Sequence, residues 1–297
     1  MTVVCLGEAI VDLVCERELD RPVDADRFRP LRGGALANTA VAASRSGGDA
    51  ALLGGVGDDG WGEWLRAGLA AEGVHVGWLA TVPAQPTPIA LVTFDRSRES
   101  VFSVYGESIG PTMAAAERFL GEAMDEASAL VFGSNTLVGE PERRITLRAR
   151  REALDRGVPV LFDPNLRPNR WREMGPAVEF CRELCDGALV VRANRGEAEL
   201  LTGETDPAAA ALGLCALGAR LGVVTLGAEG AVMRGASAGE VASPPVEVVA
   251  PLGAGDAFMG ALAAGLAELD WDGGRAAEAL PGAAAAGAAA CGRWGAQ

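Results

Sequence analysis

Short apolar runs alternate with amphipathic stretches along most of this 297-residue chain, and this alternation restricts its fold more than any other feature. The runs are rich in valine and leucine, as strands buried on both faces are. They lie at residues 3–7, 50–56, 129–133, 158–163, 188–191 and 222–227, and stretches of helical period lie between them at 61–72, 113–127, 141–156 and 175–185. The pattern predicts an α/β fold with a doubly wound, mostly parallel sheet flanked by helices. Ligands bind such sheets at the carboxyl ends of the strands.

Two segments break the alternation. Residues 10–30 are extended and contain prolines, and residues 88–106 read as two strands joined by the polar turn DRSRES at 95–100. Together they predict a small β-sheet beside the main one, placed to act as a lid that keeps water from a reacting group. We therefore expect a single domain over residues 1–297, with lid strands inserted from about 10–30 and 88–106.

Charge and hydropathy exclude several classes of partner. The net charge of −14 repels phosphate backbones and anionic lipids, so we expect neither nucleic acid nor membrane as a partner. No apolar run reaches the roughly 18–20 residues that a membrane span needs. The N-terminus enters an apolar run with no basic region before it, which is unlike a signal peptide and predicts a cytoplasmic protein.

The chain contains no lysine, which excludes the phosphate-binding Walker loop because that loop requires one. The sole histidine, His75, lies among apolar residues and is interpreted as structural. A serine–histidine–aspartate triad would have to be built on it. The six cysteines form no CxxC pair and are interpreted as buried thiols, which suits a reducing compartment.

The segment GAGDAF carries the strongest chemical signal. Gly253, Ala254 and Gly255 follow an apolar run and precede an apolar-periodic helix that we expect to begin near Asp256. Backbone N–H groups at a helix N-terminus bind anions, and a carboxylate beside them can accept the proton of an attacking hydroxyl. The alternative is that Asp256 is only the N-cap of the helix.

A second polar segment, GGALAN, lies near the N-terminus. Gly33 and Gly34 allow the backbone to approach a ligand closely, and Asn38 can donate to and accept from sugar hydroxyls. Asp12, which follows the first apolar run, is a second carboxylate suited to hydroxyl recognition. The alternative is a loop with a tightly packed helix, and a surface aspartate.

GGALAN and GAGDAF resemble the two signatures of the ribokinase-like (PfkB) carbohydrate kinases. Further segments resemble that family in the same order, and the resemblance extends from Gly7 to about Ala296. These segments are VGDDGWG (56–62), DPNLRPNRW (163–171), NRGEAELLTG (194–203) and TLGAEGAV (225–232).

The resemblance implies a role for each matching position. It makes Asp256 the base and residues 253–255 the anion hole, and it implies ATP and Mg²⁺ as cofactors. The sugar would be held by Asp12, Gly33, Gly34 and Asn38; the nucleotide by Asn194, Thr225, Gly227 and Gly230; and Mg²⁺, through its waters, by Asn194 and Glu197. Lid strands pair between subunits in many members, so the resemblance also admits a homodimer.

Within the family, DPNLRPNRW resembles the fructokinase and 2-keto-3-deoxygluconate kinase branch. The resemblance adds Asp163 and Tyr105 to the sugar site, and it places Arg167 beside phosphate or a substrate carboxylate, a role its planar fork suits. The alternative for Arg167 is a surface loop. Keto-acid kinases carry arginine after the tyrosine, whereas Gly106 follows Tyr105 here. This favours a neutral sugar, fructose, with 2-keto-3-deoxygluconate as the alternative.

Two positions depart from the family pattern. Ala250-Pro251 stands where the second signature usually opens with Asp-Thr, which puts a potassium site in doubt. Ala284 stands where an asparagine often lies beside the adenine. Three further functions remain as alternatives: a nucleoside kinase of the same fold, a non-catalytic ligand-binding regulator, and a nucleotide-dependent dehydrogenase. The dehydrogenase is disfavoured because the early glycine motif does not join the first strand directly to a helix.

Overall fold

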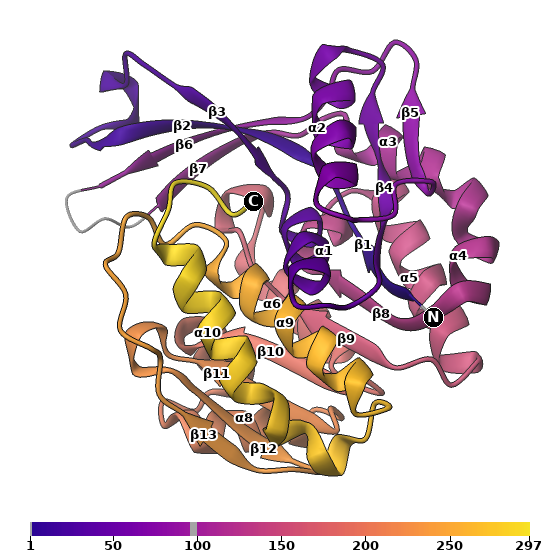
Figure 1. Cartoon of the computed structure of the whole chain (residues 1–297), viewed down its shortest axis with the longest axis vertical. Coiled ribbons are helices and arrows are strands. Elements are labelled where there is room, and N and C mark those ends of the chain that lie inside the picture. Colours follow the sequence, from indigo (N-terminus) through magenta and orange to yellow (C-terminus); the bar gives the residue numbers. More distant parts are fainter. Residues whose placement is uncertain (1, 96–99) are drawn as a thin grey trace.

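The computed structural model describes residues 2–95 and 100–297, which form a large sheet, a small sheet and flanking helices (Figure 1). Within the described residues, the large sheet has nine strands in the order β13, β12, β11, β10, β9, β8, β1, β4, β5. Neighbours from β5 across to β11 pair in parallel, whereas β12 and β13 are antiparallel at one edge. The predicted mostly parallel sheet is confirmed. The strands span Thr2–Leu6 (β1), Ala50–Gly57 (β4), Leu79–Val82 (β5), Ala127–Gly133 (β8), Val160–Asp163 (β9), Val190–Asn194 (β10), Leu221–Thr225 (β11), Ala231–Gly235 (β12) and Gly239–Val241 (β13).

Helices cover both faces of this sheet. Along β1, Val4 and Leu6 pack into one hydrophobic core and Val3 and Cys5 into another, because successive side chains of a strand point to opposite faces. Helices α3 to α8 contribute to the first core, and α1, α2, α9 and α10 to the second. The bounds are Ala35–Arg45 (α1), Gly60–Ala71 (α2), Ile109–Ala116 (α3), Leu120–Glu126 (α4), Glu140–Asp155 (α5), Met174–Leu184 (α6), Arg195–Thr202 (α7), Pro207–Ala216 (α8), Ala254–Glu268 (α9) and Leu280–Cys291 (α10).

The helix predicted over residues 113–127 is two helices instead. Helices α3 and α4 are joined by a 3-10 turn at Glu117–Phe119. The tighter turn lies where Phe119 packs, half-buried, against the same core as its neighbours.

The small sheet lies beside the main one and projects from it (Figure 1). Its strand order is β3, β2, β6, β7, with β2 and β6 parallel and the outer pairs antiparallel. The strands span Ile10–Glu18 (β2), Arg29–Gly33 (β3), Ile89–Phe94 (β6) and Ser100–Tyr105 (β7). They fall largely in the two segments that break the alternation. Most of the DRSRES turn, residues 96–99, lies outside the described residues.

No helix among residues 2–95 and 100–297 is both long enough and apolar enough to span a membrane. His75 is exposed and packs edge-on against the ring of Trp78, with 4.9 Å between ring centroids. It does not line either of the two pockets described below.

Candidate active site

The GAGD segment forms the N-terminus of helix α9. Gly253 is the N-cap in the left-handed conformation (φ 73°), and the helix begins at Ala254, two residues earlier than the sequence suggested. Asp256 is therefore the third helical residue, and no side-chain cap bond forms. The first N–H groups of a helix have no intrahelical partner, so the backbone of Ala254 and Gly255 can bind an anion. The interpretation of Asp256 as a simple N-cap is wrong.

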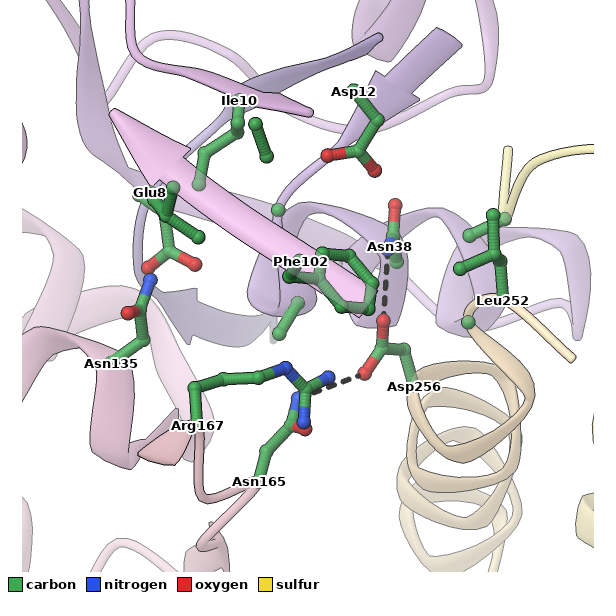
Figure 2. A pocket seen from close by; sticks show the side chains of 16 residues that line it. Glu8, Ile10, Asp12, Asn38, Phe102, Asn135, Asn165, Arg167, Leu252 and Asp256 are labelled. Atoms are coloured by element: carbon green, nitrogen blue, oxygen red, sulfur yellow. Dashed lines mark hydrogen bonds between the residues drawn. The ribbon is translucent and has the colours of Figure 1, made fainter. Parts of the chain in front are cut away.

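Hydrogen bonds from two asparagines orient the Asp256 carboxylate (Figure 2). Asn38 Nδ2 donates to Oδ2 at 2.8 Å, and Asn165 Nδ2 donates to Oδ1 at 3.4 Å. Asn38 lies on α1 and its own Oδ1 accepts from Gln297 Nε2 at 2.9 Å. The carboxylate is thus fixed by segments from three distant parts of the chain.

Burial gives Asp256 a pKa suited to a base. Its pKa is raised to about 6, chiefly by desolvation and in part by the nearby carboxylate of Asp163. The hydrogen bond from Asn38 and the charges of Arg167 and Arg192 lower it. A general base is most effective when its pKa lies near the working pH, so Asp256 is ionised at neutral pH yet still basic enough to accept a proton.

A first pocket opens beside Asp256. The pKa of the Asp12 carboxyl is raised to about 7, chiefly by desolvation; the charges of Asp256 and Glu8 also raise it, and that of Arg167 lowers it. Arg167 is half-buried, and its guanidinium lies 5.2 Å from the ring centroid of Phe102. The pocket is lined by Glu8, Ile10, Asp12, Gly34, Ala35, Asn38, Ala90, Phe102, Val104, Asn135, Asn165, Arg167, Leu252, Gly253, Asp256 and Ala296.

Most residues expected to hold the sugar come together in this pocket. Asp12, Gly34, Asn38 and Arg167 all line it. Gly33 pairs with Ile10 across β2 and β3, and a Cβ atom there would lie 2.1 Å from Asp12 Oδ2. A glycine at this position therefore leaves room for the Asp12 carboxylate.

Tyr105 and Asp163 do not join this pocket. Phe102 and Val104 of β7 line it, and because side chains alternate along a strand, Tyr105 points away from it. Tyr105 is 62% exposed. Asp163 is buried and pairs with Arg192 instead, with 3.0 Å between Oδ2 and Nη1.

A second pocket, of about 620 Å³, adjoins the first. The residues predicted to bind nucleotide, Asn194, Thr225, Gly227 and Gly230, all line it. Its wall on α10 consists of small residues, including Ala284, Gly287 and Ala288. Ala254 and Gly255 line this second pocket, whereas Gly253 and Asp256 line the first. The GAGD segment therefore forms part of the wall of both.

Arg192 connects the carboxyl ends of three strands. It lies on β10, its Nη1 donates to Asp163 on β9, and its Nη2 donates to Thr225 Oγ1 on β11 at 2.7 Å. A Cβ atom on Gly255 would lie 2.5 Å from Nη1, so the guanidinium packs against the anion hole. Sequence reasoning missed Arg192, since nothing local distinguishes a buried arginine in a strand.

Glu197 lies behind this network. Its Oε1 accepts from the backbone N–H of Leu166 at 2.7 Å, and its Oε2 accepts from that of Asn194 at 3.0 Å. Asn194 in turn caps helix α7 through Oδ1, which accepts from Glu197 N at 2.9 Å. Desolvation raises the pKa of Glu197, and the charge of Asp163 raises it further. The positive charge beside this pair of carboxylates is that of Arg192, which lowers the pKa of Glu197. Glu197 itself is buried and lines neither pocket.

The sequence analysis also assigned no role to Glu8, Asn135 and Asn165, which line the first pocket. Asn165 lies inside the segment DPNLRPNRW, and Glu8 lies between the first apolar run and Asp12. Both residues follow the end of a predicted strand, which is where ligands bind a parallel sheet. Asn135 follows β8 in a segment that carries no motif.

Comparison with known proteins shows the family of this chain. The family model "pfkB family carbohydrate kinase" matches residues 1–297. The chain is 34% identical over 265 residues to fructokinase-1 of Zea mays, covering 88% of this chain and 81% of the relative.

Two solved structures are also similar. A fructokinase double mutant from Vibrio cholerae O395, in fructose, ADP and potassium ion bound form, superposes with a TM-score of 0.82 at 29% identity, over 99% of this chain and 93% of the other. Aminoimidazole riboside kinase from Salmonella enterica, complexed with aminoimidazole riboside and an ATP analogue, superposes with a TM-score of 0.82 at 28% identity, over 100% and 95%. With the family model matching the full length, this chain belongs to the pfkB family of carbohydrate kinases.

Proposed function

We propose that this chain is an ATP-dependent fructokinase, which transfers the γ-phosphate of ATP to a hydroxymethyl group of fructose. The observation that carries the proposal is the shared wall between the two pockets. Asp256 lines the first pocket and Gly255 the second, one residue apart at the start of α9. A hydroxyl in one pocket and a phosphate in the other would therefore meet at the anion hole.

The chain's own groups account for the transfer. Asp256 accepts the proton of the attacking hydroxyl while Asn38 and Asn165 hold the carboxylate in place. The backbone amides of Ala254 and Gly255 stabilise the charge that develops on the transferred phosphoryl group. Arg192 contributes a fixed positive charge against the same loop.

The residues of the NxxE segment fit a hydrated magnesium ion. Both oxygens of Glu197 already accept backbone N–H groups, and carboxylate oxygens have further lone pairs for water. Mg²⁺ retains several waters in proteins. Asn194, which lines the second pocket, would hold the ion through these waters, and the buried Glu197 would act through Asn194, whose backbone N–H group donates to it. When bound with the nucleotide, the ion neutralises charge on the phosphates.

Fructose is favoured over a sugar acid by the charges in the first pocket. Among the described residues that line it, Arg167 is the sole cationic side chain, against the carboxylates of Glu8, Asp12 and Asp256. The relative from Zea mays is named a fructokinase. A nucleoside kinase is the second candidate, because the similar Salmonella enterica enzyme acts on a riboside and because Phe102 offers an aromatic face here.

The small sheet supports the proposal of a lid within a single domain spanning residues 1–297. Ile10, Asp12, Ala90 and Phe102 reach the first pocket from its strands, so closure of the sheet would exclude water from the reaction. The exposed Tyr105 and Val101 on its edge strand β7 are compatible with a homodimer formed through the lid. The six free cysteines suit a cytoplasmic location.

A coupled assay of ADP release tests the proposal. We expect Mg²⁺-dependent turnover with fructose, and a kcat/KM at least tenfold lower with 2-keto-3-deoxygluconate, ribose and aminoimidazole riboside. Preference for the keto-acid would show that Gly106 was misinterpreted, and preference for the riboside would favour the nucleoside kinase. Absence of turnover with every acceptor would favour a non-catalytic binding protein.

A further inference from the structure

Glu8 is a buried carboxylate that the proposed reaction does not yet use. It follows β1, which lies inside the large sheet between β8 and β4, and it is 1% exposed. Among residues 2–95 and 100–297, its Oε2 atom has no hydrogen-bond partner. A buried polar atom without a partner destabilises the fold, and native structures rarely keep one without a reason.

The surroundings of this carboxylate favour its ionised form in part. The side chain of Asn135, the backbone N–H groups of Glu8 and Ala35 and the charge of Arg170 all lower its pKa. Arg170 Nε in turn donates to Asn135 Oδ1 at 2.9 Å, which fixes the amide. Burial outweighs these effects and raises the pKa of Glu8.

Glu8 lies at the wall of the first pocket, where its Oε2 atom can reach a bound ligand. Glu8 lines the first pocket together with Asp12 and Asp256. In Figure 2, Glu8 and Asn135 lie on one side of the pocket and Asp256 on the other. A sugar with one hydroxymethyl group at Asp256 would therefore extend its other end toward Glu8.

We propose that Glu8 is a specificity-determining residue whose Oε2 accepts a hydrogen bond from a hydroxyl of the sugar, at the end remote from the phosphorylated group. The inference rests on the proposed sugar kinase function. It assigns the pocket to polyhydroxy substrates that carry a hydroxyl donor at both ends. An acceptor lacking the remote hydroxyl leaves Oε2 buried and unpaired, and this penalty produces the selectivity.

The test pairs changes in Glu8 with changes in the substrate. Glu8→Ala and Glu8→Met both remove the acceptor, and Glu8→Met retains most of the side-chain volume. In the wild type, one monodeoxy derivative of fructose should lose roughly 10- to 100-fold in kcat/KM, the effect of a hydrogen bond to a charged group. In both variants that derivative and fructose should differ by less than about threefold, while the penalties for the other derivatives remain.

A matched control comes from Glu142, another buried glutamate, which lies outside both pockets and caps helix α5 by accepting from Gly139 N. Glu142→Met should keep every penalty of the wild type in its folded fraction. Calorimetric Kd values for fructose without ATP give a second readout, expected to weaken in both Glu8 variants and not in Glu142→Met.

The outcomes separate the two proposals. If either Glu8 variant keeps the full penalty for every derivative, the assignment of Glu8 is wrong although the enzyme is still a fructokinase. If the wild type phosphorylates no sugar, the proposed function itself fails.

Discussion

The side-chain amide of Asn38 donates a 2.8 Å hydrogen bond to the carboxylate of Asp256 across 218 positions of sequence. Asn38 lies in the GGALAN segment on α1 and Asp256 in the GAGD segment on α9, and these two helices pack against each other. The contact therefore joins the segment assigned to the sugar with the segment assigned to the base. A substitution of either residue should therefore alter the hydrogen bonding of the other side chain.

Asp256→Asn should lower kcat by roughly 100- to 10,000-fold, because it removes the basicity of the side chain but keeps its shape. Helix α9 should persist, since Gly253 and not Asp256 is its N-cap. Steady-state kinetics and calorimetric binding of fructose would measure both effects. Asp206→Asn is the control, because Asp206 is an exposed N-cap of α8 that accepts from Ala209 N. Turnover of Asp256→Asn near that of the wild type would reduce Asp256 to a structural residue.

The rate should fall as the pH decreases through about 6, where Asp256 takes up a proton and loses its function as a base. The hydrogen bond from Asn38 favours the ionised form, so Asn38→Ala should move this inflection to higher pH. The pKa of Asp12 is also raised, to about 7, so its titration overlaps. Asp12→Asn should remove that second inflection and leave the first. An inflection that stays in place in Asn38→Ala would argue against Asp256 as the titrating base.

Arg167→Ala should lower kcat/KM by roughly 10- to 100-fold while the melting temperature stays nearly constant. Its Nη1 donates a long, weak hydrogen bond to the carbonyl oxygen of Leu166 at 3.4 Å, so the fold depends little on this arginine. Its charge lowers the pKa of Asp256, so the variant's pH inflection should also shift upward. Arg172→Ala, an exposed arginine five residues on, is the control. A large loss of stability with normal kinetics would show that Arg167 is structural.

Activity should depend on Mg²⁺ but only weakly on potassium. Ala250 is 1% exposed and offers a methyl group where a carboxylate would complete a monovalent-cation site, and Pro251 restricts the loop. The similar Vibrio cholerae fructokinase structure contains a potassium ion, so a weak response to potassium would distinguish this chain from that enzyme. Rates would be measured in potassium-free and sodium-free buffer, with and without added potassium at matched ionic strength. An increase of tenfold or more would overturn the prediction.

The sequence by itself determined the features that depend on neighbours along the chain. The alternation of apolar runs and helical periods predicted the doubly wound sheet, because burial of a strand or a helix face depends on local spacing. The break in that alternation predicted the strands of the small sheet. GAGD predicted a helix N-terminus with exposed amides, since glycines there leave the backbone accessible.

Only the tertiary structure decided which side chains meet. The order β8, β9, β10 places Asn135, Asn165 and Arg192 beyond the carboxyl ends of adjacent strands or close to them, which no local pattern encodes. The raised pKa values of Asp12 and Asp256 depend on burial by distant segments. Even Tyr105, placed in the sugar site by resemblance, points away because the register of β7 turns Phe102 and Val104 inward. The local sequence specifies which side chains a helix or strand carries on each face. The packing of elements distant in sequence decides which other side chains these contact.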